Sequence, residues 1–95
     1  MSPREQLTEK SQEAMQAAQT LAEERGNPEI EPEHLAVALL EQPRGTAAPL
    51  LQAVGADPAR VHDDFARAVD HFPRVEGGTH DITPSRRTQR IFKTA

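Results

Sequence analysis

Four prolines stand at the beginning of stretches with helical spacing, and they constrain the fold more than any other feature of the sequence. Pro3, Pro32, Pro58 and Pro84 each follow a polar residue, and none is followed by an early helix breaker. Proline is favoured in the first turn of a helix, because its missing N–H would have no partner there and its φ is already helical. The sequence therefore predicts an all-α fold, a chain of helices separated by short turns.

The first predicted helix ends at Arg25-Gly26, where Gly26-Asn27-Pro28 breaks the pattern. It carries an apolar stripe at helical spacing, formed by Leu7, Ala14, Ala18, Leu21 and Ala22. Two residues could cap the start of this helix, and the sequence does not decide between them. Ser2 begins the capping box "SPRE", and Thr8 stands six residues later.

A second helix is predicted to open at "IEPEHL", with Pro32 in its first turn. We expect its inward residues to be Leu35, Leu39 and Leu40. Ala36 and Ala38 would let a neighbouring helix approach closely. Thr46 is then predicted to cap a short third helix, "AAPLLQAV", that ends at Gly55.

A fourth helix is predicted to start with Asp57 as its cap and to close at Pro73. Its expected core residues are Val61, Phe65, Ala68, Val69 and Phe72. Residues 73–83 contain two adjacent glycines and are predicted to form a linker with at most a short extended piece. Thr83-Pro84-Ser85 is the predicted start of a fifth helix.

The two ends of the chain resemble each other. "LTEKSQEAMQAA" at residues 7–18 aligns without gaps with "PSRRTQRIFKTA" at residues 84–95. The matches are modest, but they coincide with helix-start chemistry at both places, which indicates an internal repeat. We therefore predict a first repeat of four helices at residues 1–72, a linker at 73–83, and the start of a truncated second repeat at 84–95.

The sequence lacks the residues that several kinds of catalytic and metal-binding site require. The chain has no cysteine, no P-loop motif for nucleotide phosphates and no glycine-flanked nucleophilic serine. Its histidines do not fall three or four residues apart, as metal-binding pairs on one helix would; they are His34, His62, His71 and His80. We predict that the chain is not an enzyme and holds no metal or cofactor.

Charge and hydropathy exclude further classes of partner. The net charge is −4, and the four bases of residues 84–95 are interpreted as the solvated face of a helix, since no aromatic platform accompanies them. We therefore expect no nucleic-acid partner. No stretch approaches the roughly 20 apolar residues of a membrane span, and the absence of cysteine suits a reducing compartment. We expect a soluble, cytoplasmic protein without a membrane partner.

Three segments together resemble a known family. They are "LTEKSQEAMQAAQTLAEERGNPEIEPEHLAVALLE", "APLLQAVGADPARV" and "HFPRVEGG". From about Leu7 to Ala95 the chain is similar to the N-terminal Clp repeat domain of the ClpB family of AAA+ disaggregase chaperones. The most specific pieces are "I-x-P-E-H-L-x-x-A-L-L" and "G…P-L-L-x-x-x-G". The resemblance implies an all-α globule of two pseudo-repeats, of which this chain has the first and the opening helix of the second.

The resemblance also implies a function. Domains of this family are non-catalytic and recognise unfolded or aggregated polypeptides for ATPase modules that this chain lacks. Thr8 matches a substrate-facing threonine of the family, and Leu7 precedes it. Ile91 and Phe92 would border the peptide groove. These four residues are the predicted substrate-binding site.

Two alternatives remain open from the residues alone. Thr8 can be a helix cap, and Ile91 and Phe92 can fold back as ordinary core. At the level of function, one alternative is an adaptor-docking domain of a ClpA- or ClpC-type protease unfoldase. The other is a stand-alone remnant without a function of its own. The "VEGG" linker favours the ClpB type over the adaptor-docking type.

Overall fold

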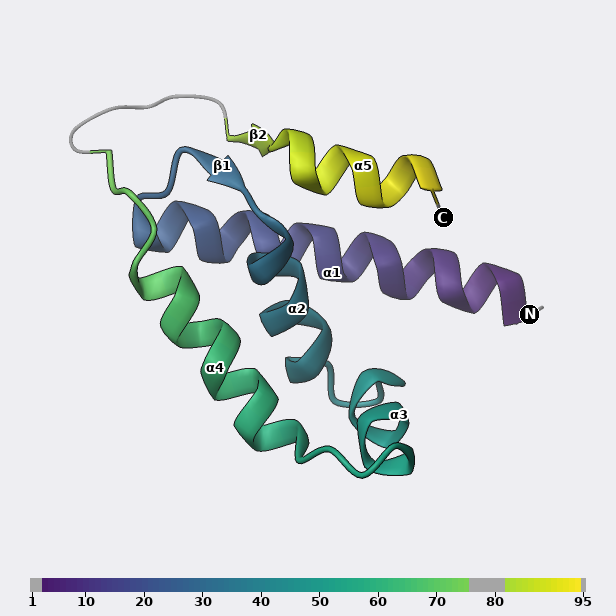
Figure 1. The fold of residues 1–95 in the computed structure, drawn as a ribbon. Helices are drawn as coiled ribbons and strands as arrows, with labels where there is room; N and C mark the ends of the chain where they lie inside the picture. The colour runs from purple at the N-terminus through teal and green to yellow at the C-terminus, as the bar shows by residue number, and fades with distance from the viewer. Residues whose placement is uncertain (1–2, 76–81, 95) are drawn as a thin grey trace.

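Five helices and two short strands form the described part of the chain. The computed structural model describes the backbone of residues 3–75 and 82–94, and the side chains of residues 9–75 and 82–91. The elements are α1 Pro3–Arg25, β1 Glu29–Ile30, α2 Pro32–Glu41, α3 Ala47–Ala53, α4 Pro58–Asp70, β2 Thr83–Pro84 and α5 Arg86–Thr94. The long α1 lies between α5 on one side and α2 on the other (Figure 1). The predicted all-α class is confirmed.

Three of the four prolines begin helices as predicted. Pro3, Pro32 and Pro58 are the first residues of α1, α2 and α4. At α4 the carboxylate of Asp57 also accepts a hydrogen bond of 3.1 Å from the backbone N–H of Ala59, which satisfies one of the open donors of the first turn.

The first helix does not begin at Thr8, because α1 already includes Pro3. Thr8 lies in the second turn of α1 and does not cap it. The expectation of a cap at Thr8 is therefore wrong, because the helix had already begun upstream of that residue. The side chain of Thr8 lies outside the described residues.

The fourth proline does not begin a helix. Thr83 and Pro84 form β2, which pairs in parallel with β1 in the register Glu29 with Thr83 and Ile30 with Pro84. Ser85 caps the next helix instead, because its hydroxyl accepts from the N–H of Thr88 at 3.3 Å. The predicted helix start at Thr83-Pro84 is wrong, because proline's φ fits an extended edge strand as well as a first turn.

The core is built largely from alanine. Its members on α1 are Ala14, Ala18 and Ala22, and they pack with Ile30, Leu35 and Ala38. Side chains of this size let α1 and α2 approach closely, as the sequence indicated. The described chain has no helix long and apolar enough to cross a lipid bilayer.

The second helix buries a different set of residues from the one predicted. α2 packs between α1 and α4, so its buried surface faces two neighbours. Val37 and Ala38 are buried together with Leu35, whereas Leu39 is 38% exposed. The expectation that Leu39 faces inward is wrong, because the two neighbouring helices leave that part of α2 uncovered.

The fourth helix ends earlier than predicted, at Asp70, so Phe72 lies beyond it. Val69 is buried, and the other expected core residues of this helix are half-buried. The ring of Phe72 packs against the imidazole of His34, with ring centres 5.3 Å apart. The end of α4 is therefore held against the start of α2.

A buried polar chain joins the same two regions. The backbone N–H of Glu31 donates to Nδ1 of His34 at 2.8 Å, so Nε2 carries the proton and donates to the Asn27 side-chain oxygen at 2.8 Å. The Asn27 amide then donates to the carbonyl of Pro73 at 3.0 Å. His34 and Asn27 are buried, so each polar group is satisfied within the protein.

Candidate functional site

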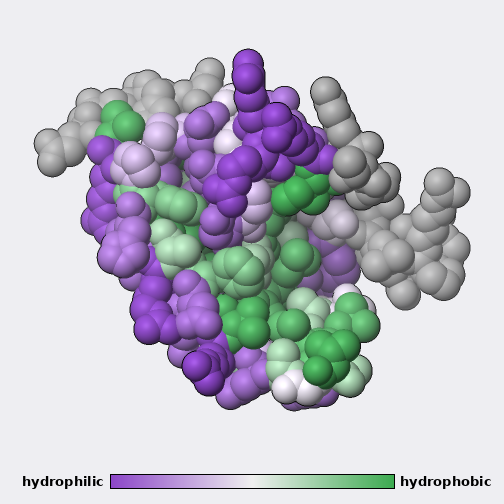
Figure 2. Space-filling model, viewed as in Figure 1, coloured by the Kyte–Doolittle hydropathy of each residue, from purple (hydrophilic) through white to green (hydrophobic). Residues whose placement is uncertain are grey.

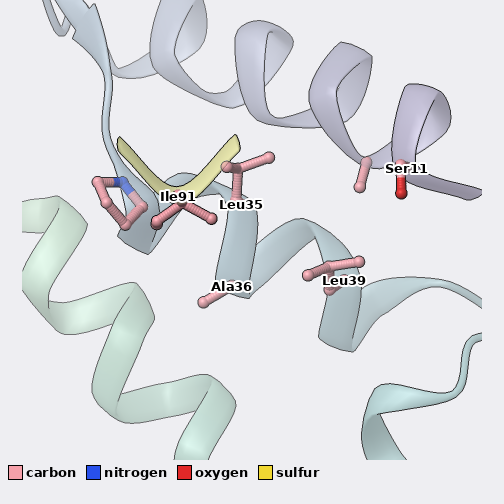
Figure 3. A pocket seen from close by; sticks show the side chains of 7 residues that line it. Ser11, Leu35, Ala36, Leu39 and Ile91 are labelled. Atoms are coloured by element: carbon pink, nitrogen blue, oxygen red, sulfur yellow. The ribbon is translucent and has the colours of Figure 1, made fainter. Parts of the chain in front are cut away.

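A cavity of about 230 Å³ opens between α1, α2 and α5. It is lined by Ser11, Ala14, Pro32, Leu35, Ala36, Leu39 and Ile91, and we call it the apolar groove. Figure 3 shows the labelled residues of the three helices around a common space. Among the described residues of this lining, Ser11 alone is polar, so they offer an occupant mainly carbon atoms.

Residue size explains why the groove exists. Ala14 on α1 and Ala36 on α2 are too small to fill the space between the helices, and Leu35 forms a buried floor. Leu39 and Ile91 stand at the opening and are 38% and 46% exposed. These two side chains offer apolar surface that would be removed from water when the groove is filled, which favours binding of apolar groups.

An ion pair joins α5 to the first turn of α2 beside the groove. Nη2 of Arg87 donates a hydrogen bond of 3.0 Å to the Glu33 carboxylate. Nη1 of Arg87 lies 4.0 Å from the Glu31 carboxylate. The hydrogen bond to Glu33 raises the pKa of Arg87, so the guanidinium keeps its charge. Because Arg87 is solvent-exposed, we expect this pair to orient α5 more than to stabilise it.

One of the four predicted site residues lies in the groove. Ile91 is part of its lining. The side chains of Leu7, Thr8 and Phe92 lie outside the described residues, so their roles stay predictions.

Sequence reasoning missed most of the groove. The signal was present in α2, where the residues from Leu35 to Leu40 form an unbroken apolar run. A helix with one buried face needs about three or four apolar residues per two turns. α2 uses part of this excess against its second neighbour, α4, and Leu39 remains exposed at the groove.

His34 and His62 have shifted pKa values, and both make structural contacts. Burial lowers the pKa of His34, which keeps the imidazole neutral within its hydrogen-bond chain. The pKa of His62 is raised, because its ring bonds to Glu41 at 2.8 Å and to Asp63 at 3.2 Å. Within residues 9–75 and 82–91, no group of three or more His, Asp or Glu residues is placed to hold a metal ion. The described lining of the groove offers apolar burial, with no reactive side-chain cluster among these residues.

A second apolar surface lies on α3. No residue of α3 is buried. Leu50 is 65% exposed, and Val54, just after the helix, is 79% exposed. Figure 2 shows hydrophobic residues gathered from the middle of this face down to α3, with hydrophilic residues along α4. Leu50 therefore provides an exposed leucine outside the groove.

Comparison with known proteins shows where similar chains occur. The family described as the Clp repeat N-terminal domain matches residues 6–95. Over 88 residues the chain is 44% identical to the chaperone protein ClpB of Mycobacterium tuberculosis, which covers 93% of this chain and 10% of the relative. It is 39% identical over 89 residues to ClpB of Bdellovibrio bacteriovorus, covering 94% and 10%. Over 75 residues it is 47% identical to ClpB of Propionibacterium freudenreichii, covering 79% and 9%. The chain thus spans about a tenth of the length of these relatives.

Proposed function

The chain belongs to the family of Clp repeat N-terminal domains, and from this premise we propose that it is the non-catalytic substrate-recognition domain of a ClpB-type chaperone. In this proposal it engages unfolded or aggregated polypeptides in the cytoplasm. The mechanical work is done by AAA+ ATPase modules that this chain lacks. Residues 1–72 form the first repeat, 73–83 the linker and 84–95 the start of the second.

The observation that carries the proposal is the apolar groove with its half-exposed opening. Leu39 and Ile91 leave apolar surface in contact with water, and the cavity of about 230 Å³ has room for a large side chain. A folded protein buries most of its leucine and phenylalanine side chains, whereas an unfolded segment exposes them. A site of this kind therefore distinguishes unfolded from folded protein without reading a specific sequence.

Binding at one such groove is expected to be weak. Burial of a single leucine contributes about 1.5–3 kcal/mol, less than the roughly 4 kcal/mol that a millimolar dissociation constant represents. The client also loses chain entropy when it is held. Weak capture suits a domain that concentrates clients near a motor and must then release them.

A pair of peptides tests the proposal. One is a fluorescein-labelled decapeptide with two leucines in a glycine–serine background, and its twin has serine in place of both leucines. We expect the leucine peptide to bind the 95-residue chain with a dissociation constant of about 1 mM or weaker, because the groove has room for one of its leucines. The twin should not bind measurably.

Two matched variants locate the site. Leu39→Ser removes an apolar side chain from the opening of the groove, and Leu50→Ser removes one from α3. Leu39→Ser should weaken leucine-peptide binding about fivefold to tenfold, the loss of roughly 1 kcal/mol or more, and Leu50→Ser should not change it. Circular dichroism checks that both variants keep their helicity. Equal binding of the two peptides, or a loss with Leu50→Ser alone, would contradict the proposal.

A further inference from the structure

The N-terminal end of α5 is fastened to the body of the protein by hydrogen bonds that the proposed function has not used. Ser85 and Thr88 are both buried, although both are polar. Thr88 lies one helical turn from Ile91, which lines the apolar groove, and Ser85 immediately precedes α5. The arrangement of these two hydroxyls therefore bears on how the groove is built.

The hydroxyls form a relay that ends on one carbonyl. Thr88 N–H donates to Ser85 Oγ at 3.3 Å, and Ser85 Oγ donates to Thr88 Oγ1 at 3.2 Å. Thr88 Oγ1 then donates to the carbonyl oxygen of Ile30 at 2.8 Å. The same oxygen accepts from Ser85 N–H at 3.0 Å, so both of its lone pairs are occupied.

The carbonyl that receives these bonds is a fixed point. Ile30 is buried in the core cluster and belongs to β1, between α1 and α2. Thr88 and Ile91 are three residues apart on α5, and residues at this spacing share a helix face. The place of the Thr88 hydroxyl on Ile30 therefore sets the place of Ile91 relative to the rest of the groove.

We propose that Thr88 is a positioning residue for client binding: its hydroxyl, with Ser85, pins α5 to the Ile30 carbonyl and so holds Ile91 as one wall of the apolar groove. The inference rests on the proposed function of the groove. A wall that is ordered before a client arrives needs no ordering when the client binds, and such preorganisation raises affinity. If α5 is released, binding of the client must also order this helix. The entropy lost in that ordering lowers the affinity.

The first test follows the wall directly and needs no ligand. The chain has three isoleucines, Ile30, Ile82 and Ile91, so a sample labelled only at the isoleucine δ1 methyl gives three signals. Relaxation caused by a soluble gadolinium chelate reports how exposed each methyl group is. Ile91 is 46% exposed, so its release should raise this relaxation about twofold, while Ile30 in the core should not change.

Two variants separate the hydroxyl from mere packing. Thr88→Val keeps the shape and removes the hydroxyl, whereas Thr88→Ser keeps the hydroxyl. We expect the valine variant to show the rise at Ile91 and the serine variant to behave as the wild type. An unchanged Ile91 signal in the valine variant would overturn the proposal, as would an equal rise in both variants. The unchanged Ile30 signal shows that the body remains folded.

The second test measures binding of the leucine decapeptide to the same variants. We expect Thr88→Val to weaken it at least threefold and Thr88→Ser to restore it. A valine variant in which Ile91 moves and binding does not change would overturn the role of α5 as a wall. If the wild type binds neither peptide, the proposed function fails, and the methyl signals still decide whether Thr88 positions α5.

Discussion

The buried amide of Asn27 offers the sharpest test of how this small protein is held together. It accepts from His34 Nε2 at 2.8 Å and donates to the Pro73 carbonyl at 3.0 Å. The chain contains a matched contact in Gln89, whose amide donates to the carbonyl of Pro84, also at 3.0 Å, on the exposed surface. Asn27→Ala and Gln89→Ala thus both remove an amide-to-carbonyl bond, and Asn27→Ala also removes the buried bond from His34.

The expected losses in the free energy of unfolding depend on whether water can replace the lost hydrogen bonds. Loss of the Asn27 amide leaves the Nε2–H of His34 without an acceptor at a position that is fully buried. An unsatisfied buried polar group costs about 1–3 kcal/mol, and the space left by the amide adds to this. Pro73 is exposed, so water replaces its lost partner. We expect Asn27→Ala to cost about 2–3 kcal/mol in the free energy of unfolding and Gln89→Ala to stay within about 0.5 kcal/mol.

Urea denaturation followed by circular dichroism measures both values. For a chain of this size the Asn27 effect corresponds to a fall of roughly 10–20 °C in melting temperature. If the two substitutions cost the same, burial does not set the strength of these bonds. The buried polar chain would then be incidental to stability.

Two further predictions concern titration and core packing. The raised pKa of His62 means that its bonds stabilise the fold fully below the unfolded pKa of about 6.5 and lose this effect as pH rises through the folded pKa. The lowered pKa of buried His34 has the opposite sign, since its contribution is present above about pH 6.5 and is lost as pH falls toward the folded pKa. In urea titrations His62→Gln should therefore cost more stability at mildly acidic than at mildly alkaline pH, and the reverse order would contradict the assignment. Ala18→Leu should destabilise the chain by about 1–3 kcal/mol or more, because Ala18 is fully buried. Ala17→Leu on the exposed side of α1 should have little effect, and equal melting temperatures for the two would show that the alanine core has spare room.

Local chemistry decided which parts of the fold the sequence could predict. The starts of α1, α2 and α4 depend on residues next to one another, so Pro3, Pro32 and Pro58 marked them correctly. The same signal at Pro84 failed because the outcome depends on Ile30, a residue 54 positions away, against which β2 pairs. No local pattern contains that partner.

The sequence allowed an apolar binding groove to be predicted, but it did not identify most of the residues that line the groove. Family resemblance pointed to Ile91, which lines it. Leu39 was assigned to the core because helical periodicity says which residues share a face, and not which neighbour covers that face. The proposed repeat shows the same limit. Its offset of 77 residues pairs Arg86, the first residue of α5, with Glu9 inside α1, so the two helix starts do not coincide.

The core and the groove of this protein have a common origin. Ala14 is a buried member of the core cluster and also part of the groove lining. α2 packs against α1 at this alanine face, and the groove stays open between α1, α2 and α5, whose first turn is held by Thr88. A larger residue at Ala14 or Ala36 would bury more apolar surface and would fill the cavity. The thin alanine core is therefore the condition for the groove, and a chain selected for stability alone would have no reason to keep it.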